Sequence, residues 1–144
     1  MSFNKDEFYA RTMHTPDSPE RAAQRAALRE LSKALIPLHR HLIDATKSDY
    51  AFAYAPITSP SHLLRLINDD AFFAWLKPLT AIIVEIDEMT RRDFESNDAA
   101  AIASRVEAFL ASQQYVELLQ REVDVATAHA ALRKVLGRLI PPQA

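Results

Sequence analysis

Apolar side chains recur at three- and four-residue steps along most of the chain, and the longest such stretch covers residues 70–92. This spacing places the apolar side chains on one stripe of an α-helix, wide enough to pack against two neighbouring helices. The stripe consists of Phe72, Trp75, Leu76, Leu79, Ile82, Ile83, Ile86 and Met89. The pattern predicts that residues 70–92 form the central helix of a bundle.

A second long helix is predicted to begin at Ser18, because Ser-Pro-Glu combines a hydroxyl N-cap, a proline in the first turn and an acid near the positive end of the helix dipole. Its apolar residues keep seven-residue spacing, which is typical of a bundle seam. The seam consists of Leu28, Leu31, Leu35, Leu38, Leu42 and Ala45. Pro37 lies inside this helix and predicts a kink near residues 33–36 without ending the helix.

The opposite face of that helix carries basic residues at four-residue steps: Arg21, Arg25, Arg29 and Lys33. Charged rows of this kind usually form a solvated face, and we expect the same here. An anion-binding strip is the alternative interpretation.

Between the two long helices, Ser59-Pro60 repeats the Ser-Pro start and predicts a short connecting helix over residues 61–67. Asn68 and Asp69 then end it and cap the central helix. Pro78 is expected to bend the central helix as Pro37 bends the first.

The C-terminal third begins with a capping cluster at residues 96–98. The last helix, at about residues 115–139, has a seam that contains two polar residues. This seam consists of Leu118, Glu122, Val125, His129, Leu132, Leu136 and Leu139. The spacing allows a break near residues 112–114 and leaves open whether residues 98–139 form one helix or two.

Composition supports an all-helical fold, because a single glycine leaves almost none of the turn chemistry that a β-sheet requires. With 144 residues the chain fits one domain. We therefore predict an all-α, up-and-down bundle of four main helices, proline-kinked in the first and central helices, with one short connecting helix. The single bundle domain covers residues 18–142, and residues 1–17 form a flexible N-terminal arm.

Charge and motifs exclude several classes of function. The formal net charge of −2 gives no general attraction to nucleic acid or to an anionic membrane. No signal peptide or membrane span is recognisable, so a cytoplasmic location is the expectation.

The absence of cysteine excludes disulfides, thiolate zinc sites and a cysteine nucleophile. No nucleotide-binding loop or zinc protease motif is present, and the sequence assigns neither a catalytic residue nor a cofactor.

Two groups of residues remain as candidates for binding. The first is aromatic: Tyr50, Phe52 and Tyr54 precede the short helix, and Phe73 and Trp75 follow it. Aromatic side chains at helical spacing usually belong to a core, but the same residues can line a ligand pocket. The second group is a weak set of metal ligands: His39, His41, Glu122 and His129. A structural role for His129 is the more common outcome.

The leading hypothesis is a non-enzymatic helical-bundle protein that acts through protein–protein contact, as a homodimer or with another protein. Its support is the two sustained seams and the apolar residues beside the central stripe, including Phe73 and Val84. The alternative is a sensor or carrier of a small molecule or haem-type ligand, with a pocket between the proline-bent helices. That pocket uses the aromatic residues, with His39 or His129 as the polar anchor. A metal-dependent enzyme is the third and least favoured hypothesis.

Overall fold

A computed structural model describes residues 16–139, except for the side chain of Ser96, and these residues form helices with no strand. Nearly all of the predicted N-terminal arm therefore lies outside the described residues. The helical elements follow one another as α2 (Pro19–Ala53), α3 (Pro60–Asp69), the 3₁₀ helix η1 (Ala71–Leu76), α4 (Lys77–Met89), α5 (Ser96–Leu110), α6 (Gln113–Arg121) and α7 (Val123–Leu139).

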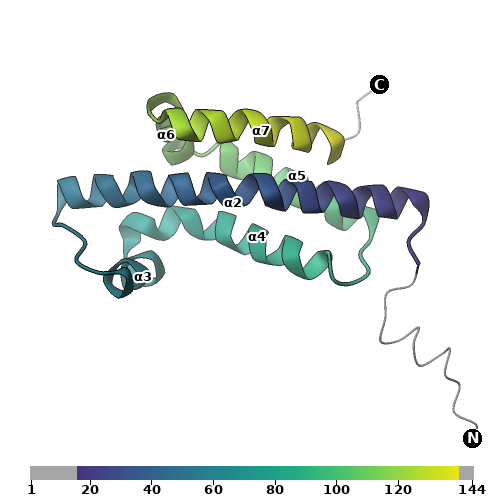
Figure 1. The fold of residues 1–144 in the computed structure, drawn as a ribbon, viewed down its shortest axis with the longest axis horizontal. Coiled ribbons are helices and arrows are strands. Elements are labelled where there is room, and N and C mark those ends of the chain that lie inside the picture. The colour runs from purple at the N-terminus through teal and green to yellow at the C-terminus, as the bar shows by residue number, and fades with distance from the viewer. Residues whose placement is uncertain (1–15, 140–144) are drawn as a thin grey trace, which may run out of the picture.

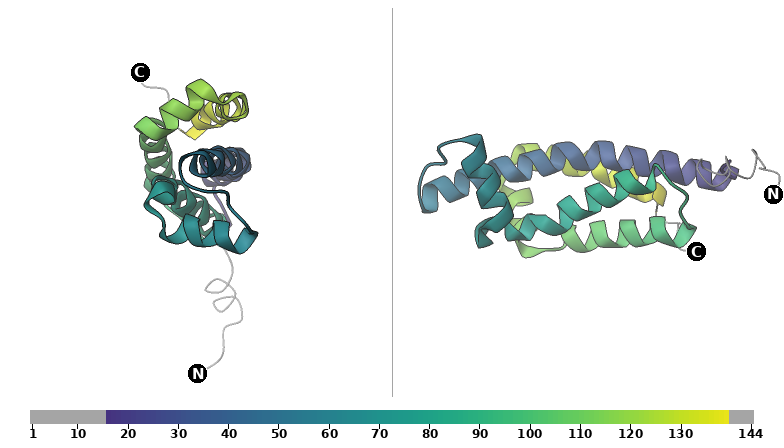
Figure 2. Two further views of the ribbon diagram at one scale, coloured as in Figure 1. Left: turned by 90° about the vertical axis from the view of Figure 1, so that its left-hand side faces the viewer. Right: turned by 90° about the horizontal axis from the view of Figure 1, so that it is seen from below.

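Four of these helices, α2, α4, α5 and α7, alternate in direction and pack side by side (Figure 1). Helix α2 lies between α4 and α7, and α5 covers the far side of the bundle (Figure 2). Helix α3 lies across the bundle axis and packs on η1. The predicted all-α, up-and-down bundle of four main helices is confirmed.

Helix α2 is the longest element, and it begins as the sequence predicts. The Ser18 hydroxyl accepts a hydrogen bond from the backbone N–H of Arg21, and Pro19 occupies the first turn. Its five seam leucines have no exposed surface, and α7 and α4 cover them from either side. Helix α2 continues through Pro37. Figure 1 shows no sharp bend anywhere along α2, in contrast to the kink predicted near residues 33–36. Lys33 and Pro37 are both exposed, so water can bond the Lys33 carbonyl that lacks a helical donor.

The predicted continuous central helix is wrong in its first two turns. Residues 71–76 form the 3₁₀ helix η1, and the α-helix begins only at Lys77. The side chain of Asp70 accepts a hydrogen bond from the Phe72 N–H and caps η1. Pro78 consequently lies in the first turn of α4, where its missing N–H removes no helical bond. It marks the start of a helix and does not bend one.

The predicted last helix is also interrupted. Helix α5 ends at Leu110 and α6 begins after Ser112, which confirms the expected break near residues 112–114. A second break falls at Glu122, whose backbone is extended, with φ −105° and ψ 117°. Residues 98–139 therefore belong to three helices, and the prediction of one helix over residues 115–139 is wrong. The turn at Glu122 lets the chain redirect from α6 into α7.

Each main helix contributes buried apolar side chains to one continuous core. The largest of these with almost no exposed surface are Tyr115 on α6 and Phe73 on η1. Within residues 16–139, no helix combines the length and the hydrophobicity that crossing a membrane would require.

Candidate functional site

Tyr50 is the centre of an aromatic cluster at the end of the bundle where α2 finishes. Its ring centroid lies 5.1 Å from that of Tyr54, 5.7 Å from that of Phe72 and 5.8 Å from that of Phe73. Tyr54 also meets Phe72 edge to face. Aromatic residues that precede and follow α3 in the sequence therefore lie together in space, as expected for either a core or a pocket.

The cluster leaves out two of the predicted residues. Trp75 stacks on Phe109 of α5 instead, with the rings 3° from parallel and their centroids 5.7 Å apart. Phe52 points away from the bundle and is 96% exposed. Phe73, in contrast, has no exposed surface, because three residues per turn in η1 place Phe73 and Leu76 on the same inward face. Phe73 is therefore part of the core and has no surface to offer a ligand.

A half-open cleft of about 360 Å³ lies beside this cluster, between α2, η1 and α6. Phe72 and Trp75 form its aromatic wall. The remaining lining comes from Thr46, Asp49, Ala71, Gln114, Glu117, Leu118 and Arg121. Arg121 Nη2 donates to Asp49 Oδ2 at 2.6 Å, and Arg121 Nε lies 3.3 Å from Glu122 Oε1. The paired carboxylates raise the pKa of the Arg121 guanidinium.

A second hollow, a groove of about 460 Å³, runs along the last turns of α2 and the segment that follows. The residues that line it are Asp44, Lys47, Ser48, Ala51, Pro56 and Ile57. Ala51, Pro56 and Ile57 supply an apolar part, and Asp44 and Lys47 supply one charge of each sign.

The four histidine and glutamate residues predicted as weak metal ligands do not form one site. His39 Nε2 lies 2.9 Å from the hydroxyl of Thr80 on α4, and burial lowers the pKa of His39. His41 and Glu122 line a small cavity of about 160 Å³ together with Asp44 and Asp124. Within the described part of the chain, no three His, Asp or Glu side chains are arranged to hold a metal ion.

His129 is held by Tyr115, whose hydroxyl oxygen lies 2.7 Å from His129 Nδ1. Arg133 Nε lies 3.4 Å from Nε2 of the same ring. Both contacts fit one neutral tautomer, in which Nδ1 donates to Tyr115 and Nε2 accepts from Arg133. Burial, reinforced by the charge of Arg133, lowers the pKa of His129, while burial raises the pKa of Tyr115 to about 12. Neither His129 nor His39 lines the cleft, so neither lies where the predicted polar anchor of that cleft would be.

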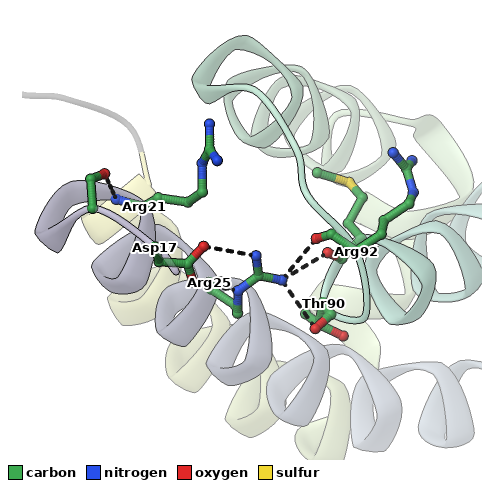
Figure 3. A network of polar contacts seen from close by, with 7 residues as sticks. Asp17, Arg21, Arg25, Thr90 and Arg92 are labelled. Atoms are coloured by element: carbon green, nitrogen blue, oxygen red, sulfur yellow. Dashed lines mark hydrogen bonds and ion pairs between the residues drawn. The ribbon is translucent and has the colours of Figure 1, made fainter. Parts of the chain in front are cut away.

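Arg25 was predicted to lie on a solvated face, and this prediction is wrong because Arg25 is buried. Its guanidinium donates to both carboxylate oxygens of Asp17, at 2.7 and 3.1 Å (Figure 3). Nη1 also donates to the carbonyl oxygens of Met89, Thr90 and Arg92, where α4 ends. The guanidinium carbon lies 5.1 Å from the centre of the Phe94 ring. The one available signal was that Arg25 precedes Leu28 by three residues, which places it on the core side of the helix.

Comparison of the chain with protein-family models, with curated proteins and with solved structures found no match.

Proposed function

We propose that this protein acts through protein–protein contact and that the end of α2 pairs two copies of the chain. The observation that carries the proposal is the 96% exposure of Phe52, next to Tyr54, which is 68% exposed. Burying an aromatic ring contributes about 25 cal/mol per Å² of apolar surface removed from water. Within residues 16–139, Phe52 buries almost none of its surface, and a partner would supply this contact.

The groove along α2 offers a place for that ring. It lies on the same last turns of the helix, and Ala51, Pro56 and Ile57 give it an apolar part. A protruding ring beside an apolar groove is self-complementary: Phe52 of each copy can enter the groove of the other. A two-fold axis closes this exchange into a dimer.

The charges at the rim favour a second copy over an unrelated partner. Asp44 and Lys47 are both exposed and lie one helical turn apart on the groove. In a two-fold pairing, Asp44 of one copy faces Lys47 of the other, and the reverse pair forms at the same time. Opposite charges matched in this way set the register of an interface.

Sedimentation equilibrium tests the proposal. The wild-type chain is expected at twice its mass of 16.2 kDa at micromolar concentration, and Phe52→Asp at the single-chain mass. Leu64→Asp is the matched control, because Leu64 is 59% exposed on α3 and lies outside the groove. A wild-type chain that sediments as a monomer overturns the proposal.

A charge exchange tests the two-fold register itself. Asp44→Lys and Lys47→Asp each place like charges opposite one another, so each single variant is expected to weaken the dimer. The double variant restores opposite charges and is expected to dimerise as the wild type does. A double variant that stays as weak as the singles rejects this pairing.

A further inference from the structure

We propose that the cleft between α2, η1 and α6 binds a small organic ammonium ion, with its positive charge against Trp75, Phe72 and Glu117. The cleft volume of about 360 Å³ is within the range of small-molecule sites, about 300–1,000 Å³. The site contains none of the residues of the α2 groove, so this inference does not depend on dimerisation.

The aromatic wall is the first reason to expect a cation. Phe72 and Trp75 reach the cleft from the same short helix, and the Phe109 ring packs on Trp75 from the core side and holds it in place. Aromatic faces attract ammonium groups through the ring quadrupole, and tryptophan does so most strongly. The apolar substituents of an organic ammonium ion would also gain from contact with these rings.

The balance of charge in the cleft is the second reason. Asp49 and Arg121 neutralise each other, and Arg121 is also paired with Glu122 from the other side. Among residues 16–139, Glu117 accepts a hydrogen bond from the neutral amide of Gln113 alone, with Gln113 Nε2 3.2 Å from Glu117 Oε1. The described residues that line the cleft therefore carry one net negative charge, and an anion would meet repulsion there.

The polar groups are mostly acceptors, which is the third reason. The buried Thr46 hydroxyl already donates to the Leu42 carbonyl oxygen at 2.7 Å, so its oxygen can only accept a further bond. The Asp49 and Glu117 carboxylates are also acceptors, while Nη2 and Nε of Arg121 are directed at the carboxylates of Asp49 and Glu122. These acceptor oxygens attract a positive charge whether or not the nitrogen of the cation carries hydrogen, and they offer a carboxylate or phosphate few donors.

The fluorescence of Trp75 can report binding in the cleft, because Trp75 is the only tryptophan of the chain. Choline serves as the cationic probe, and its neutral carbon isostere, dimethylbutanol, serves as the matched control. Titration with choline is expected to change the Trp75 fluorescence saturably, and added salt is expected to weaken the effect. The neutral isostere is expected to produce no saturable change. An equal response to the two probes, or no response to choline, overturns the proposal.

Variants identify the site. Glu117→Gln is expected to weaken choline binding about threefold to fivefold, since one partly solvated charge contact is removed. Glu88→Gln on the exposed face of α4 is the control and is expected to leave binding unchanged.

Trp75→Leu should abolish the broadening of the choline methyl signals that the protein causes in NMR, with far-UV circular dichroism confirming the fold. Phe52→Asp should bind choline normally, which separates failure of this proposal from failure of the dimer. Unchanged choline binding in both Glu117→Gln and Trp75→Leu rejects the cleft as the site.

Discussion

The side-chain Nη1 of Arg25 lies 3.1 Å from the carbonyl oxygen of Thr90, so a residue of α2 caps the C-terminal end of α4. The last carbonyl groups of an α-helix have no partner within the helix and carry the negative end of its dipole. The buried guanidinium of Arg25 donates hydrogen bonds to these carbonyl groups and places a positive charge at the negative end of the dipole. Asp17 balances its charge from the opposite side.

We expect Arg25→Met to lower the free energy of unfolding by about 3 kcal/mol, because it leaves a carboxylate and several carbonyl groups without their buried partner. Arg25→Lys should recover only part of this loss, since an ammonium group cannot reproduce the planar fork of donors. Urea unfolding followed by circular dichroism measures both.

Arg29→Met is the control for Arg25, because Arg29 occupies the next position of the same basic row and is exposed. Its free energy of unfolding should stay within about 0.5 kcal/mol of the wild type. Equal effects at the two positions would mean that Arg25 is solvated, as the sequence pattern alone suggested.

The Tyr115–His129 contact should contribute measurably to stability. Tyr115→Phe keeps the buried ring and removes the hydroxyl, so the free energy of unfolding should fall by about 1 kcal/mol. Tyr54→Phe, at a residue that is 68% exposed, should have little effect. A double-mutant cycle with His129→Ala should give a coupling energy of about 1 kcal/mol, and additive effects would show that the contact contributes nothing.

Stability should also depend on the two partly buried histidines, His39 and His129. Both have a pKa below the ordinary value of 6.5, so the unfolded chain binds protons more readily than the folded one. Their contribution is fully present above pH 6.5 and is lost as the pH falls below it. Urea unfolding at a series of pH values should show this decline, and His39→Gln/His129→Gln should decline less. Identical slopes in the two proteins would contradict the assignment.

The two helical prolines offer a matched pair. Pro37 lies inside α2 and Pro78 lies in the first turn of α4. Pro37→Ala restores a donor for the Lys33 carbonyl and removes a steric clash, so it should raise the free energy of unfolding by about 1–3 kcal/mol. Pro78→Ala should change it by less than about 1 kcal/mol, because that position needs no donor. Thermal unfolding compares the two variants directly, and an equal gain from both would contradict the distinction.

Periodicity was sufficient to predict the bundle because it depends only on which side chains must leave water. The α2 seam from Leu28 to Leu42 repeats without interruption, and each of its leucines is fully buried. The start of α2 at Ser18-Pro19 could also be predicted, since a helix cap is formed by residues that are neighbours in the sequence. Both features are local in sequence, and both were predicted correctly.

The features that the sequence did not reveal are local departures from α-helical geometry and contacts between residues that are distant along the chain. Phe73 is buried because η1 has a 3₁₀ twist, which an α-helical period cannot anticipate. The break at Glu122 interrupts a seam that looks continuous from Leu118 to Leu139. Arg25 and the cleft at Trp75 depend on partners that approach from other helices. The spacing of apolar residues along the chain cannot by itself predict contacts between residues of different helices.

The most extensive helix–helix contact in the bundle joins α2 to α7, the first and last helices of the described chain. Pairing segments so far apart in sequence requires closing a long loop, which slows folding. During synthesis, the leucine seam of α2 emerges from the ribosome long before α7 can cover it. A newly made chain therefore carries a partly uncovered apolar stripe until α7 has been synthesised, and that interval is its period of greatest vulnerability to aggregation.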